Sequence, residues 1–197
     1  MRWCYSILFL AIWACNQPKQ TVTAIEPQPI TIHSTTLLNT DNSLQLINGF
    51  YTYKGQLFSG YIQTNFPSGI IQLLQTIYKG KSEGCTKEFF ESGHKLSTRY
   101  YSAGEKDNMH TGWWDNGNIR FVYHFKKGNY HGSFEEFYYS GKPLKKIFYT
   151  NGTDSCGWGW RENGKLFMNY IMKDGRRFGL MNAQLCYSLK NENGVYK

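Results

Sequence analysis

The sequence lacks the short motifs typical of catalytic and metal-binding proteins. It contains no HExxH, no CxxC pair, no GxSxG elbow, no Walker-type phosphate loop and no EF-hand loop. Glu135 and Glu136 are neighbours, so on a strand they point to opposite faces and do not form a catalytic pair. The chain has five scattered histidines, none in a metal-ligand spacing: His33, His94, His110, His124 and His131. We therefore expect no catalysis, no cofactor and no metal.

The sequence also leaves little room for helices. Glycine recurs through residues 49–179 too often for helices of the usual length of about 11 residues. Aromatic residues make up 17% of the chain, with 15 Tyr and 13 Phe, and such side chains pack well on the pleated surface of a strand. The composition therefore predicts an all-β, repetitive and turn-rich protein.

A 24-residue repeat organises the glycines. Gly69, Gly93, Gly117 and Gly141 are each 24 residues apart, and Gly164 follows after 23. A second set keeps the same step: Gly80, Gly104, Gly128, Gly152 and Gly175. A fixed period indicates stacked structural units. Two turns in each period leave two strands of about seven residues, so we expect an elongated antiparallel β-meander of about five tandem hairpin repeats. Gly112 does not fit the spacing. Either the loop Glu105–Thr111 protrudes or Gly112 is not the equivalent glycine, and we favour the second because the overall period never changes.

Aromatic residues follow the same period. One row contains Phe89, Trp113, Phe137 and Trp160, and a second contains Tyr101, Phe125 and Tyr149. We expect each row to align across the sheet and to stabilise it, because cross-strand aromatic pairs do so. The alternative is an exposed aromatic groove that binds a peptide, glycan or lipid. Its candidate residues are Trp113, Trp114, Trp158 and Trp160.

These units resemble the MORN repeat (membrane occupation and recognition nexus), and more closely its variant bacterial form. The matching stretches are Phe89-Phe90-Glu91-Ser92-Gly93, Trp113-Trp114-Asp115-Asn116-Gly117, Tyr138-Tyr139-Ser140-Gly141 and Arg161-Glu162-Asn163-Gly164-Lys165-Leu166. The resemblance covers roughly residues 49–180 and implies a meander that is mostly one sheet thick. Some bacterial members of this variant family are labelled antitoxins of the YwqK type, which implies neutralisation of a toxin as one function.

The N-terminus is typical of an export signal. Arg2 precedes an apolar run that ends at Trp13 and is too short to span a bilayer, which takes roughly 20 apolar residues. Ile12-Trp13-Ala14-Cys15 resembles a bacterial lipoprotein box, although Trp13 replaces the usual small residue. The resemblance implies that residues 1–14 are removed and that Cys15 is acylated, which anchors the protein to a membrane. The alternative is an ordinary cleaved signal with an incidental cysteine.

The remaining segments are divided by composition. Pro, Gln and Thr are frequent after Cys15, so residues 15–45 are interpreted as the lipidated cysteine and a flexible tether, of which Ile30–Leu38 could add an edge strand. Residues 46–181 form the predicted repeat array and residues 182–197 a C-terminal cap or tail.

Few cysteines remain beyond the predicted signal. Cys85 and Cys156 lie about three repeats apart, on the order of 29 Å at about 4.8 Å per strand, whereas a disulfide needs Cα atoms within about 7 Å. A bridge between them is therefore excluded. A Cys156–Cys186 bridge stays open, and no structural zinc site is expected.

Charge is distributed unevenly along the predicted sheet. The formal net charge is +8, and removal of Arg2 with the signal would leave +7. Cations flank the second-set glycines: Lys79, Lys81, Lys126, Lys127, Lys173, Arg176 and Arg177. Acidic residues flank the opposite turns: Glu91, Asp115 and Glu162. Lysines at turns commonly serve solubility alone. The alternative is a basic rim that binds anionic lipid, with Lys126, Lys127, Arg176 and Arg177 as its candidate residues.

We therefore predict a non-catalytic, exported lipoprotein of the bacterial cell envelope that offers a protein-binding or scaffolding surface. Its expected partners are an unknown envelope protein and, through the anchor, the membrane, with no nucleic acid. The alternatives are an antitoxin or immunity-type neutraliser, and direct binding of anionic lipid or glycan through the basic rim and aromatic face.

Overall fold

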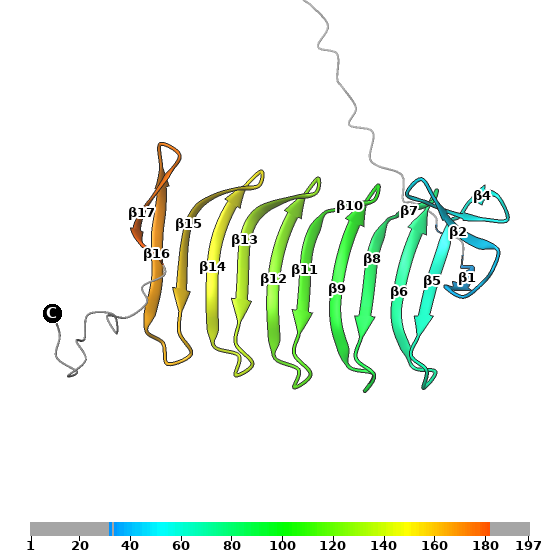
Figure 1. Ribbon diagram of the computed structural model, residues 1–197, viewed down its shortest axis with the longest axis horizontal. Coiled ribbons are helices and arrows are strands. Elements are labelled where there is room, and N and C mark those ends of the chain that lie inside the picture. Colours follow the sequence, from blue (N-terminus) through cyan, green and yellow to red (C-terminus); the bar gives the residue numbers. More distant parts are fainter. Residues whose placement is uncertain (1–31, 33, 182–197) are drawn as a thin grey trace, which may run out of the picture. The chain divides into compact units, whose positions relative to one another are not determined.

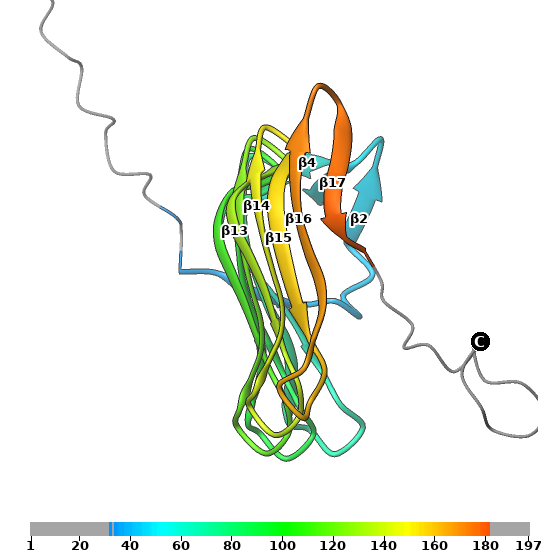
Figure 2. The same ribbon diagram turned by 90° about the vertical axis from the view of Figure 1, so that its left-hand side faces the viewer.

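The computed structural model describes residue 32 and residues 34–181 of the chain. These residues form strands and turns without any helix, which confirms the all-β prediction. Figure 1 shows the strands of the large sheet side by side, and the edge-on view in Figure 2 shows that they form a single layer. The predicted signal at 1–14, Cys15 and the tail at 182–197 lie outside the described residues. Within that part of the chain, no helix is long and apolar enough to cross a bilayer.

The large sheet has fourteen strands in a meander-like order. Its main path is β1 (Thr36–Leu38), β5 (Gly60–Asn65), β6 (Ile71–Tyr78), β8 (Gly84–Phe89), β9 (Lys95–Ser102), β11 (Asn108–Trp113), β12 (Ile119–Lys126), β13 (Asn129–Phe137), β14 (Pro143–Thr150), β15 (Thr153–Trp160), β16 (Leu166–Lys173) and β17 (Arg176–Leu180). Two short strands extend the hairpins, β7 (Lys81–Ser82) beside β6 and β10 (Glu105–Lys106) beside β9. Every pairing from β5 to β17 is antiparallel, as the repeat predicts.

Two kinds of turn alternate along the sheet. At the edge drawn at the top of Figure 1, both central residues of each turn have positive φ, for example Lys127 (48°) and Gly128 (79°), which defines a type I′ turn. At the opposite edge, only the glycine has positive φ, as at Gly117 (85°). Asn116 precedes it but does not form the type I′ turn that Asn-Gly favours; its side chain accepts a hydrogen bond from the Asn118 N–H at 3.0 Å.

Gly112 is not a turn residue, as its irregular spacing predicts. Asn108, with φ of 61°, lies 24 residues after Gly84 and 24 before Gly132, and all three have positive φ. Gly112 instead lies within β11, opposite Phe121 of β12. The period is therefore kept by an asparagine, a residue that tolerates the left-handed conformation better than most.

Four successive type I′ turns are each fastened to the preceding repeat by a side chain, and these side chains also recur every 24 residues. The backbone N–H of the first residue of the turn donates a hydrogen bond to a side chain 20 residues earlier, and the accepting residues are here called the staple residues. The pairs are Lys79 to Ser59 (2.8 Å), Ala103 to Glu83 (2.7 Å), Lys127 to Asp107 (3.2 Å) and Asn151 to His131 (3.4 Å). The following glycine donates to a backbone carbonyl, as Gly128 does to Lys106 at 2.8 Å. The turn edge is thus a continuous chain of joints between repeats.

The N-terminal end departs from the repeat. β1 pairs with β5 in parallel, so the large sheet is mixed, with its one parallel pairing outside the predicted antiparallel repeat array. Parallel strands need a crossover, and residues 39–59 supply one that contains a second, three-stranded sheet of β2 (Leu44–Ile47), β3 (Phe50–Tyr53) and β4 (Gln56–Leu57). An edge strand in the predicted range is confirmed for Thr36–Leu38, so the strands begin before the predicted end of the tether at residue 45.

The main hydrophobic core lies at this end. Phe58, Ile62 and Ile77 are buried, and partly buried residues of the small sheet and β1 pack against them: Leu37, Leu44, Tyr51 and Tyr53. Elsewhere the single layer leaves most side chains half-buried or exposed, so contacts within each face replace a central core.

Candidate binding surfaces of the sheet

One face of the sheet, here called the aromatic face, carries a continuous row of rings. Ring centroids are 5.6 Å apart for Tyr101–His110, 4.5 Å for His110–Phe125, 4.6 Å for Phe125–Tyr130 and 5.2 Å for Tyr130–Tyr149. The predicted alignment of Tyr101, Phe125 and Tyr149 is confirmed, with two further rings between them. Since His110 and Phe125 are buried and the other three half-buried, the row chiefly packs against itself.

His110 is the polar member of this row. Its Nε2 lies 2.7 Å from the Tyr100 carbonyl oxygen, so Nε2 carries the proton and donates it. Burial lowers the pKa of His110 below 6.5, and the nearby positive charges of Lys106 and Arg99 lower it further, while the bond to Tyr100 acts in the opposite direction. His110 is thus a neutral ring that fills the sheet between two aromatic neighbours.

The four candidate tryptophans do not form one site. All four are half-buried. Trp113 ends β11, and the adjacent Trp114 donates from Nε1 to the Phe137 carbonyl oxygen at 3.2 Å, which ties one turn to the next repeat. The Trp160 carbonyl oxygen accepts a hydrogen bond from the Tyr138 hydroxyl at 3.0 Å. Trp158 lies on the face of the sheet opposite the aromatic face. Three of the four candidates therefore lie at the turns.

The predicted basic rim is interrupted by carboxylates. Lys126 and Lys127 are exposed at one type I′ turn, but the Lys127 N–H donates to Asp107. Arg176 is exposed four strands further along, whereas Arg177 forms an ion pair with Asp154 at 3.0 Å. The four candidate cations thus fall into two separate pairs among acidic neighbours.

The face opposite the aromatic face carries an exposed apolar row near the C-terminal edge. Strand register places Phe148, Cys156, Ile171 and Phe178 directly across from one another on β14, β15, β16 and β17. Phe148 is 37% exposed, Ile171 56% and Phe178 50%. Trp158 packs edge-to-face on Phe148 at 6.3 Å, and Leu180, 42% exposed, extends the surface along β17. These six residues are called the C-terminal apolar row.

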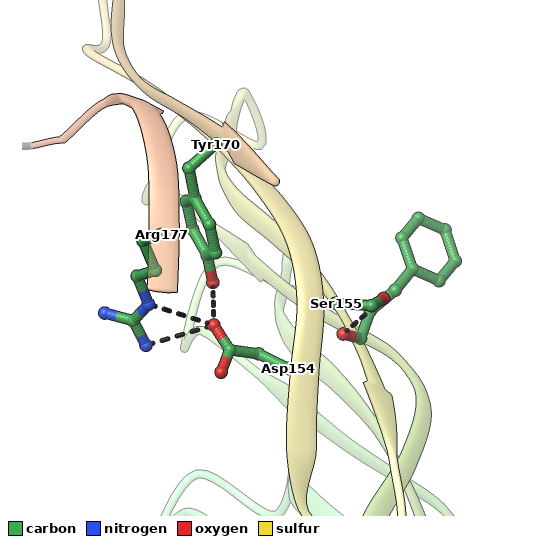
Figure 3. Close-up of polar contacts among 5 residues, drawn as sticks. Asp154, Ser155, Tyr170 and Arg177 are labelled. Atoms are coloured by element: carbon green, nitrogen blue, oxygen red, sulfur yellow. Dashed lines mark hydrogen bonds and ion pairs between the residues drawn. The ribbon is translucent and has the colours of Figure 1, made fainter. Parts of the chain in front are cut away.

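An ionic lock on the aromatic face fixes the strands beneath this row (Figure 3). Asp154 of β15 accepts from the Tyr170 hydroxyl of β16 at 2.5 Å and from Nε of Arg177 on β17 at 3.1 Å. Burial alone would raise the pKa of the Asp154 carboxyl, but the bond from Tyr170 and the charge of Arg177 outweigh it, so this pKa is lowered. The edge strand is therefore held in a defined position.

Gly157 makes this lock possible. A Cβ at Gly157 would lie 2.7 Å from Cε1 of Tyr170, so only a glycine lets the Tyr170 ring lie flat against β15. Tyr170 is 2% exposed, and burial together with its bond to Asp154 raises its pKa. Its hydroxyl therefore stays protonated and donates.

His124, another of the histidines, has a structural partner. Nδ1 of His124 lies 3.1 Å from the Ser133 hydroxyl and 3.0 Å from the Ser133 carbonyl oxygen. Within residues 34–181, no group of three or more His, Cys, Asp or Glu side chains is placed to hold a metal ion. Cys85 and Cys156 are both free, so the exclusion of a bridge between them is confirmed; Cys186 lies outside the described residues.

The C-terminal apolar row was not predicted. Its signal is the mostly apolar sequence of β16 together with Phe178 and Leu180 of β17, which the 24-residue period does not mark because this row uses the positions between the periodic aromatics. Chemically, the row offers apolar contact beside an edge of β17 that pairs with no other described strand. Neither a protein-family model nor a curated protein matches this chain.

Proposed function

We propose that this chain is a non-catalytic, lipid-anchored repeat protein of MORN-like type that holds a protein partner at the bacterial cell envelope. The repeated hairpins and the lipoprotein-like segment ending at Cys15 support the type and the location. The observation that carries the binding function is the C-terminal apolar row, which ends at the edge strand β17.

The geometry favours binding of an extended segment. Among the described strands, β17 pairs only with β16, so its other edge offers backbone N–H and C=O groups to a further strand. A partner segment that pairs there would place alternate side chains on Phe178 and Leu180. Exposed apolar side chains that lie together commonly mark protein interaction sites. The ionic lock on the reverse side keeps the edge ready for pairing, which limits the entropy lost on binding.

Affinity capture from native membranes tests this proposal. The wild type is compared with Ile171→Glu, which changes the row, and with Ile119→Glu, which introduces the same charge at an exposed isoleucine four strands away, 42% exposed. We expect one stoichiometric protein that the wild type and Ile119→Glu retain and Ile171→Glu loses. Retention of the same proteins by all three would overturn the proposal.

The anchor is tested separately by mass spectrometry of the mature chain, with Cys15→Ser as the variant that cannot be acylated there. We expect an acyl group on Cys15 of the wild type; an unmodified Cys15 would exclude acylation at this residue as the anchor. A captured toxin whose activity the chain blocks would specify the neutraliser form of the proposal. That form requires a single tight cognate partner, so capture of several unrelated proteins would contradict it.

A further inference from the structure

The N-terminal end of the sheet exposes aliphatic side chains that the proposed partner surface does not use. Leu46 is 62% exposed, Ile47 48% and Leu57 56%, and Leu46 is the most exposed large hydrophobic residue among the described ones. Leu46 and Ile47 precede the turn of the β2–β3 hairpin, and Leu57 lies in β4 beside it. These residues are called the hairpin tip. Leu46 and Ile47 point to opposite faces of the small sheet, so no single protein groove explains both.

The charge around the tip has one sign along the sequence. Residues 42–82, which are 41 residues, contain three lysines and no Asp or Glu, so their net charge is +3. Lys54, Lys79 and Lys81 are all exposed, and none of them forms an ion pair among the described residues. Fourteen acidic residues occur elsewhere in the chain, so their absence here is local.

The lysines lie beside the apolar residues in space. Nζ of Lys81 lies 5.1 Å above the ring of Phe50, and Nζ of Lys54 lies 5.2 Å from that of Tyr53. A Cβ at Gly80 would be 3.0 Å from Cδ2 of Leu57, so Leu57 lies against the turn that carries Lys79 and Lys81. One carboxylate, that of Glu105, lines the hollow beside Gly49, where Lys81 also lies.

The hairpin is rigidly mounted on the sheet. Leu44 and Tyr51 pack against the core, and the Tyr51 N–H donates to the Gly80 carbonyl oxygen at 2.8 Å. A four-residue strand is about 13 Å long. That length lets the tip enter the headgroup region, to a depth of about 5–10 Å, while the base stays on the protein.

We propose that the hairpin tip inserts into the headgroup region of an anionic lipid bilayer, with Lys54, Lys79 and Lys81 at the phosphates. Long lysine side chains extend toward the interface while aliphatic side chains enter it. The site follows the predicted anchor in sequence, with Thr36 of β1 21 residues after Cys15. The inference rests on the proposed lipid anchoring and extends it, because it orients the sheet with its N-terminal end on the membrane and its C-terminal apolar row away from it.

Tryptophan reporters test the insertion in the full chain purified from membranes. Leu46→Trp places the reporter at the tip, and Ile119→Trp places it at an exposed site on β12. Each variant is reconstituted in phosphatidylcholine–phosphatidylglycerol vesicles with or without brominated acyl chains, and wild-type emission is subtracted. We expect bromine to reduce the emission added at 46 by at least about twofold, as insertion at that depth requires, and to leave that added at 119 unchanged.

The outcomes separate the two proposals. If the chain does not associate with vesicles at all, both the anchor and the inserted tip are wrong. If it associates but the emission added at 46 is unchanged by bromine, only the insertion is wrong. Lys54→Glu combined with Lys81→Glu in the Leu46→Trp chain reverses the net charge of residues 42–82 from +3 to −1 without changing the aliphatic residues. We expect weaker quenching, and undiminished quenching would exclude the role of the lysines.

Discussion

Gly112 lies where no side chain fits. A Cβ built on it would be 2.2, 2.6 and 2.8 Å from three carbons of the Phe121 ring, which covers it from the neighbouring strand. Its backbone has no positive φ, so the Phe121 ring, and not the backbone conformation, opposes alanine at this position. Gly112→Ala must therefore displace Phe121, which stacks on Tyr123 at a centroid distance of 4.5 Å.

The magnitude follows from three contributions. Overpacking a site of this kind costs about 1–3 kcal/mol. Loss of the Phe121–Tyr123 stack adds about 0.5–1.5 kcal/mol. Replacing glycine by alanine also restricts the unfolded chain, which stabilises the folded state by about 0.4–1 kcal/mol and offsets part of this loss. We therefore expect Gly112→Ala to lower the free energy of unfolding by roughly 0.5–4 kcal/mol.

Urea denaturation followed by tryptophan fluorescence measures this effect in two backgrounds. In Phe121→Ala the ring is absent, so the three atoms that would lie nearest to the added Cβ are removed. There we expect Gly112→Ala to be neutral or slightly stabilising, which gives a coupling of at least about 1 kcal/mol between the two sites. An equal cost in both backgrounds would refute the reasoning, because the cost would then arise in the backbone.

Three further predictions concern single side chains. Asp107→Ala should remove the acceptor for the Lys127 N–H and cost about 1 kcal/mol, with faster amide exchange at that turn, whereas Asp107→Asn should retain most of the stability. Because burial lowers the folded-state pKa of His110, the unfolded chain binds a proton at this residue before the folded chain does as the pH falls below 6.5. Thermal melts should therefore show stability that declines below this pH. An equally steep decline in His110→Phe would show that His110 is not its cause. Asp154→Ala should leave the buried Tyr170 hydroxyl without its acceptor, cost about 1–3 kcal/mol and increase amide exchange in β17; unchanged exchange would mean that the lock does not hold the edge.

The lowered pKa of Asp154 also sets a direction for acid stability. Its folded-state pKa lies below the ordinary value of 3.8, so the lock contributes fully above that value and is lost as pH falls through the folded-state pKa. Acid should therefore release β17 at a lower pH than His110 begins to destabilise the centre of the sheet.

Glycine spacing was sufficient to predict the turns, because positive φ is a property that few other residues supply. Asn108 shows the limit of that signal, since its place could be recognised only from the unchanged period on either side. The staple residues have the same period and were not predicted. Ser59, Glu83, Asp107 and His131 share only the ability to accept a hydrogen bond, so no common residue type marks their position.

Long-range placement could not be derived from local pattern. The parallel pairing of Thr36–Leu38 with β5 depends on the crossover formed by residues 39–59, and no residue within Thr36–Leu38 itself indicates that its partner strand is parallel. The exposure of Ile171 and Phe178 was also hidden, because alternation shows that two faces differ but does not show which face is covered.

The staple joints allow the protein to grow by duplication. Each joint unites one acceptor position with one turn of the next unit, and both recur in every 24-residue period from Ser59 to Asn151. A tandem copy of one whole period would therefore bring its own acceptor and its own turn, and the neighbouring joints would close unchanged. Insertion of any other length would leave a joint without its partner. Evolution can thus adjust the distance between the two ends of the sheet only in whole repeats, each about two strand spacings or roughly 10 Å wide.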